Sequence, residues 1–145
     1  ALGITAMNVA PEYGTVETRA YLKLIELEEI LFKEGLVSKK SDLKNCIRRE
    51  SVKSRRWEKW MTDDTVSKTT EELLQDEEII TVITDISGHY TFNNDNVKKE
   101  IEALFENLSG AGVNAEEYVI YKLKESLDRY VECFNLKGYT SRLKK

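Results

Sequence analysis

Only one of the 145 residues is proline, and this scarcity is the feature that most constrains how the chain folds. Proline ends or kinks helices, because its ring removes a backbone N–H and clashes with the preceding turn, and average proteins contain about 5% of it. Apolar residues also recur every three or four positions along most of the chain, which is the spacing of one helix face. We therefore predict an all-α protein, a single compact bundle of four to five helices.

The length of the chain fits one domain, because domains cluster at about 100–150 residues. Hydrophobic residues make up 41% of the sequence and charged residues 33%, which is typical of a folded globular protein. We predict a flexible N-terminal arm over residues 1–14, a single helical domain over 15–138 and a basic C-terminal tail over 139–145. No apolar run approaches the ~20 residues of a membrane span, and no basic, apolar leader is present, so we expect an intracellular (cytoplasmic) protein without a membrane partner.

Three segments have the clearest helical pattern. The first covers residues 15–34, where Thr15 is a residue type that caps helices. The second covers residues 94–108, with Asn94 or Asp95 as its cap, and the third covers residues 114–136, with Asn114 as its cap. In the third segment the residues assigned to the apolar stripe are Tyr118, Leu123, Leu127, Tyr130, Val131 and Phe134.

Residues 79–92 fit two structures. Six consecutive β-branched residues, 79–84, favour a strand, and the turn at Ser87 and Gly88 would then make a short β-hairpin. The apolar positions of the same segment also continue a helical stripe that begins at Leu73. We favour the helix, because the segments on both sides are helical, and keep the hairpin as the alternative.

Residues 38–61 predict a basic amphipathic helix, which starts at Ser38 or Ser41 and runs to about Met61. Apolar side chains fall on one arc of this helix and basic side chains on the opposite arc. Ser51 and Ser54 lower the helix propensity in the middle, where a break is the alternative. Trp57 falls within the apolar arc and is expected in the core, whereas Trp60 falls near the edge of that arc and is the better candidate for exposure.

The charges of the chain are separated along the sequence. Residues 39–59 contain nine basic and three acidic side chains, a balance of +6, in a protein whose net charge is −4. Residues 60–97 contain one basic and nine acidic side chains, a balance of −8. Such a concentration of positive charge indicates a binding surface. The alternative is that the basic and acidic segments face each other in the fold.

The residues that usually perform catalysis are few. His89 is the only histidine, which excludes multi-histidine metal sites, and its glycine-containing surroundings predict a turn with an ordinary surface histidine. Cys46 falls on the apolar arc of its helix, and neither Cys46 nor Cys133 belongs to a motif that activates a thiol. No glycine-rich phosphate loop occurs. We therefore expect no enzyme activity, no cofactor, no metal and no small-molecule substrate. The alternative is an enzyme in which Cys46 or Cys133 acts together with His89.

These patterns favour a protein-interaction module, such as a regulatory or assembly subunit. Its surfaces would be the basic helix over residues 39–59 and an acidic surface over residues 60–97, and they would bind a protein partner or a second copy of the chain. The alternative is a nucleic-acid-binding protein whose basic helix contacts phosphates while an exposed tryptophan stacks on bases. The predicted binding residues are Lys44, Arg48, Arg49, Lys53, Arg55, Arg56, Lys59 and Trp60.

Overall fold

The computed structural model describes residues 10–138, and within this range every regular element is a helix. The all-α prediction is therefore confirmed. The α-helices are α1 (Ala10–Lys33), α2 (Leu43–Ser54), α3 (Asp63–Val66), α4 (Thr70–Gln75), α5 (Glu77–Ser87), α6 (Asp95–Gly110) and α7 (Ala115–Cys133). Two short 3₁₀ helices, η1 (Glu58–Trp60) and η2 (Gly88–Tyr90), lie between them. These seven α-helices, counted over residues 10–138, exceed the four to five that the sequence predicted.

Part of the difference lies in the predicted basic helix over residues 38–61. α2 ends at Ser54, and Arg55 adopts a left-handed conformation with φ of 52°, which turns the chain out of the helix. The Ser54 hydroxyl donates to the Ser51 carbonyl at 2.7 Å, a local bond that competes with helix continuation. Beyond the turn, the Trp57 indole donates to the Val52 carbonyl at 3.1 Å and closes the end of α2. The prediction of a single helix over residues 38–61 is therefore wrong, and the alternative, a break in the middle of the segment, is confirmed.

The rest of the difference lies in residues 60–92. The short helices α3 and α4 occupy the acidic connection, and α4 begins with a capping box between Thr69 and Glu72. Asp76 then caps α5 by accepting from the backbone N–H of Ile79 at 3.1 Å. The hairpin alternative is thus wrong, because residues 77–87 are helical and the described chain contains no strand.

α1 begins at Ala10, earlier than the predicted start at Thr15. Pro11 lies in its first turn, where a backbone N–H would have no acceptor within the helix, so the absence of one costs no hydrogen bond. The remainder of the predicted arm, residues 1–9, and the predicted basic tail, residues 139–145, lie outside the described residues.

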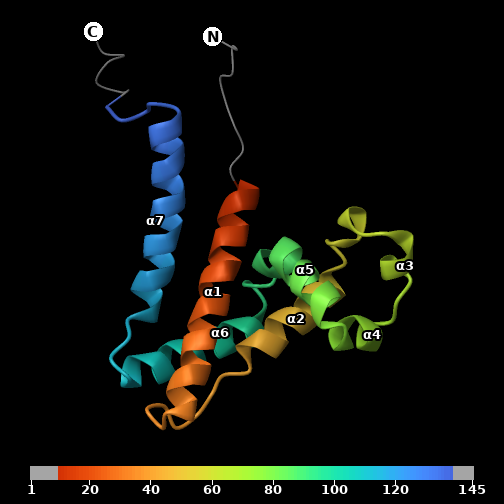
Figure 1. Cartoon of the computed structure of the whole chain (residues 1–145), viewed down its shortest axis with the longest axis horizontal. Helices are drawn as coiled ribbons and strands as arrows, with labels where there is room; N and C mark the ends of the chain where they lie inside the picture. The colour runs from red at the N-terminus through yellow and green to blue at the C-terminus, as the bar shows by residue number, and fades with distance from the viewer. Residues whose placement is uncertain (1–9, 139–145) are drawn as a thin grey trace.

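The core consists of two apolar clusters. The larger one lies where α1, α2 and α6 meet the start of α7, and the smaller one joins the end of α2 to α4 and α5. α7 lies antiparallel beside α1, whereas α3 and α4 lie at the opposite edge of the molecule (Figure 1). Within residues 10–138, every helix is too short or too polar to cross a lipid bilayer.

A buried carboxylate joins three parts of this fold. Glu28 of α1 is fully buried, and its oxygens accept from the Ser41 backbone N–H at 3.0 Å and from the Ser41 hydroxyl at 2.8 Å. The same carboxylate accepts from the Asn107 side-chain amide of α6 at 2.7 Å. Since a buried charge needs such partners, Glu28 fixes where the loop before α2 crosses α1.

Candidate functional site

A groove of about 790 Å³ opens between the N-terminal part of α1, the segment that follows α2, and η2. Three cationic side chains and three rings line it, together with aliphatic and hydroxyl groups and one carboxylate. We call it the basic aromatic groove, and its residues are Pro11, Thr15, Arg55, Arg56, Glu58, Lys59, Trp60, Ile86, His89 and Tyr90.

One wall of the groove is the segment from Arg55 to Trp60. Trp57 anchors this segment in the smaller core cluster, where only 1% of its surface is exposed. The turn at Arg55 and the 3₁₀ helix η1 then direct Trp60 outward, with 65% of its surface exposed. The predicted division between a buried and an exposed tryptophan is therefore confirmed.

The other wall depends on two glycines that let α1 approach η2. A Cβ atom on Gly14 would lie 2.4 Å from the His89 ring, and a Cβ on Gly88 would lie 2.7 Å from Cγ2 of Thr18. Both distances are shorter than real Cβ contacts allow, so neither position has space for a side chain. The close contact holds His89 against α1 and leaves the neighbouring Tyr90 half exposed on the groove.

The cations of the groove lie on its aromatic rings. The Arg56 guanidinium is 4.3 Å from the centroid of the Tyr90 ring, and the Lys59 ammonium is 5.1 Å from the centroid of the Trp60 ring. Both are within cation–π distance, which keeps the cationic groups beside the ring faces. Arg55 forms an ion pair with Glu58 inside the same groove. The arrangement combines positive charge with flat apolar surface.

His89 is the most unusual polar group of the groove. Its Nδ1 is buried and has no hydrogen-bond partner in the described part of the chain. Burial, with a smaller contribution from the Arg56 charge, lowers the pKa of His89. The shift favours the neutral form of the imidazole, which packs against Tyr90 with ring centroids 3.9 Å apart. The prediction of an ordinary surface histidine is wrong, because the contact with α1 half-buries the ring.

The structure divides the predicted binding residues into two groups. Arg55, Arg56, Lys59 and Trp60 meet in the groove. The other predicted cations lie outside it, and three of them have carboxylate partners. Those three pairs are Arg48 with Glu77 at 2.5 Å, Arg49 with Asp42 at 2.8 Å and Lys53 with Glu50 at 2.7 Å.

Lys44 also lies outside the basic aromatic groove. It lines a separate hollow between α1 and α2, beside Glu29 and Arg48.

The basic and acidic segments are joined by one ion pair among residues 10–138, the bidentate contact of Arg48 with Glu77. Other carboxylates of the acidic segment, such as Asp63, Glu71 and Glu78, are exposed and form no ion pair within that range. The two segments adjoin in the fold, because α2 packs against α4 and α5 through apolar side chains. Only one ion pair links them within the described residues, so the unpaired exposed carboxylates stay available to a partner.

Other chemistry-bearing groups do not gather into a site. Cys46 is buried, and burial raises the pKa of its thiol, which makes it less reactive. Cys133 is exposed near the end of α7. Among residues 10–138, the His, Cys, Asp and Glu side chains form no group of three or more that could hold a metal ion.

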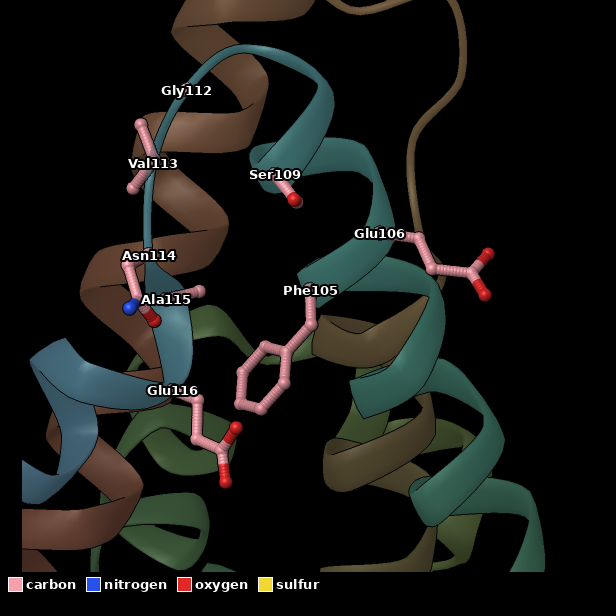
Figure 2. A pocket seen from close by; sticks show the side chains of 8 residues that line it. All are labelled: Phe105, Glu106, Ser109, Gly112, Val113, Asn114, Ala115 and Glu116. Carbon is pink, nitrogen blue, oxygen red and sulfur yellow. The ribbon is translucent and has the colours of Figure 1, made fainter.

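A second hollow, of about 710 Å³, lies at the corner between α6 and α7. Figure 2 shows that the carboxylates of its two acidic residues, Glu106 and Glu116, point in different directions, with the Phe105 ring between them. Ligand sites in proteins place a few polar groups so that they converge on one point. This hollow has no such convergence, so the basic aromatic groove is the better candidate.

The sequence pattern did not predict the wall of the groove formed by Ile86, His89 and Tyr90. These residues are distant in sequence from Arg55 and Trp60, and the signal that could have found them is the pair of glycines that brings α1 against η2. Comparison of the chain with protein-family models, with curated proteins and with solved structures finds no match in any of the three.

Proposed function

We propose that this protein is a non-enzymatic interaction module and that the basic aromatic groove binds an acidic segment of a partner protein. The observation that carries the proposal is the gathering of Arg55, Arg56 and Lys59 around one groove that also presents the exposed rings of Trp60 and Tyr90. Tryptophan, tyrosine and arginine are the residues that contribute most to binding at protein interfaces.

The chemistry of the groove suits a peptide that alternates carboxylates with apolar side chains. Carboxylates would accept hydrogen bonds from Arg56 and Lys59, and apolar side chains would cover Trp60 and Ile86. The groove holds about 790 Å³, so it can contact only a short segment of a partner. The lowered pKa of His89 favours its neutral form, so the cations that line the groove are Arg55, Arg56 and Lys59.

Single-stranded nucleic acid is the second candidate for the same groove. The observation that favours it is the pair of exposed rings, Trp60 and Tyr90, each beside a cation, since bases stack on such rings while phosphates contact the cations. The net charge of −4 argues against it, because a polyanion is repelled by an acidic protein at long range, and proteins that bind nucleic acid are usually basic.

The proposal is tested by fluorescence anisotropy with three labelled probes: a peptide rich in Asp, Glu and Leu, a single-stranded oligonucleotide and a duplex. Each is titrated at about 50 and 200 mM salt. We expect the peptide to bind and the triple variant Arg56→Ala/Lys59→Ala/Trp60→Ala to lose at least ~10-fold in affinity, because interface arginines and tryptophans are the costliest to truncate.

A matched control removes the same kinds of side chain elsewhere. The variant Lys98→Ala/Lys99→Ala/Tyr121→Ala removes exposed cations of α6 and an exposed aromatic ring of α7, and it should bind the peptide like the natural protein. Equal loss in both variants, or no peptide binding at the lower salt, would reject the proposal. Binding of the oligonucleotide alone, with a log–log salt slope of roughly −0.7 per neutralised phosphate, would favour the second candidate.

A further inference from the structure

The outer face of α7 carries an apolar stripe that its own chain leaves uncovered. Ile120, Leu127 and Phe134 are 43%, 47% and 45% exposed, respectively. None of the three belongs to either core cluster or to the residues packed against them. The sequence pattern assigned Leu127 and Phe134 to the same stripe as Leu123, but only Leu123 packs against the core.

α1 covers a different face of α7. Ala115, Val119 and Ser126 are the buried residues of α7, and the Ser126 hydroxyl donates to the Glu12 carboxylate of α1 at 3.3 Å. The Tyr130 hydroxyl donates to the same carboxylate, so the first turn of α1 is held against the C-terminal half of α7. At ~100° per residue, Leu127 lies about a quarter turn from Ser126 and therefore points away from the line of contact with α1.

The spacing of the stripe matches that of another helix. Ile120, Leu127 and Phe134 are seven residues apart, and Leu123 and Tyr130 lie between them at the second apolar position of each heptad. Apolar residues with this 3.5-residue spacing pack against a helix that has the same pattern. Ile120, Leu127 and Phe134 are the exposed positions of this pattern, whereas Leu123 packs against the core and Tyr130 bonds to Glu12. A second copy of the chain can supply a matching row of exposed residues.

The stripe and its flanking charges are also self-complementary. An antiparallel pair of α7 helices, related by a two-fold axis at Leu127, places Leu127 against Leu127 of the other copy and Ile120 against Phe134. The midpoint of Lys124 and Asp128 lies one residue from this axis, so each lysine lies within about 3 Å, along the helix direction, of the level of the aspartate of the other copy at the edge of the stripe. Both side chains are exposed, and neither forms an ion pair within residues 10–138.

We propose that this protein associates with a second copy of itself through α7, antiparallel across a two-fold axis near Leu127. The occupant of the exposed stripe is the identical stripe of the other copy, and the two Lys124–Asp128 pairs set the direction of the helices. The interface is isologous, so it closes at two copies.

The size of the contact predicts a weak dimer. α7 has 19 residues and is therefore about 28 Å long. One helix face of this length covers less than the roughly 800 Å² per partner of a standard interface, so we expect a dissociation constant in the micromolar range or weaker.

Sedimentation velocity over a range of concentrations tests the proposal on the full chain. We expect a monomer–dimer equilibrium, which Leu127→Glu should weaken at least ~100-fold because it places two carboxylates in an apolar contact. The matched control is Val82→Glu on α5, since Val82 is 42% exposed, similar to Leu127. This variant should dimerise like the natural protein, and circular dichroism should show that both variants keep their helix content.

A charge exchange tests the direction of the helices. Lys124→Glu alone and Asp128→Lys alone should each weaken the dimer, by about tenfold, because each creates two like-charge contacts. The double variant Lys124→Glu/Asp128→Lys should restore the natural affinity, an outcome that a parallel arrangement or a different surface would not give. A protein that stays monomeric at about 1 mM, or a dimer that Leu127→Glu leaves intact, would overturn the proposal.

Discussion

Glu28 is a single residue on which the meeting of α1, α2 and α6 depends. Its buried carboxylate accepts three hydrogen bonds from Ser41 and Asn107. We expect Glu28→Ala to lower the free energy of unfolding by about 2–4 kcal/mol, because it leaves those donors buried without an acceptor. Urea unfolding measures the change. Glu29→Ala is the matched control, since Glu29 lies beside Glu28 and is less buried, and it should change the stability by less than ~0.5 kcal/mol. Equal effects of the two substitutions would contradict the role of Glu28.

His89 makes a second residue-level prediction, and as the only histidine it is easily followed by NMR. Burial lowers its pKa in the folded state below the unfolded value of about 6.5. At pH values between these two pKa values, the unfolded state binds more protons than the folded state. The contribution of His89 to stability is therefore fully present above pH ~6.5 and is lost as the pH falls. A pH titration of the imidazole signals checks the sign, and a folded-state pKa at or above the unfolded value would contradict it.

At the scale of elements, the close approach of α1 to η2 makes a prediction that opposes helix propensity. Alanine is more favourable than glycine in a helix by about 1 kcal/mol. Gly14→Ala should nevertheless destabilise the protein, because the added Cβ would lie 2.4 Å from the His89 ring. Gly110→Ala is the control, since that position at the end of α6 has open space around it, and this variant should be as stable as the natural protein or more so. Thermal unfolding compares the two, and a stabilised Gly14→Ala variant would refute the close contact.

The sequence patterns predicted some of the helices and left others open. Periodicity and capping residues predicted α1, α6 and α7, because those signals are local. They did not settle the end of α2, because the turn at Arg55 is held by the burial of Trp57 against residues of α4 and α5. The candidate site was likewise predicted only where its residues are close together in the sequence. Its cations and Trp60 lie in one segment, whereas Tyr90 reaches the groove only through the packing of Gly14 on His89.

At the scale of the whole molecule, the two proposed surfaces lie on different elements. The groove uses α1, η1 and η2, whereas self-association uses the outer face of α7. We therefore expect the surfaces to work independently. Leu127→Glu should bind the acidic peptide with unchanged affinity, and the Arg56→Ala/Lys59→Ala/Trp60→Ala variant should still dimerise. Anisotropy and sedimentation measure the two properties, and loss of both in either variant would show that the surfaces are coupled.

The two tryptophans provide the most direct test of the groove as the binding site. The Trp57 indole is buried and bonded to the Val52 carbonyl, whereas the Trp60 indole is exposed in the groove. The measurement is a titration of ¹⁵N-labelled protein with the acidic peptide, in which both indole N–H signals are followed. We predict a saturable shift of the Trp60 signal and of the His89 ring signals, with the Trp57 signal unchanged. Saturable binding of the peptide without any shift of the Trp60 indole signal would place the binding site elsewhere and contradict the proposed function.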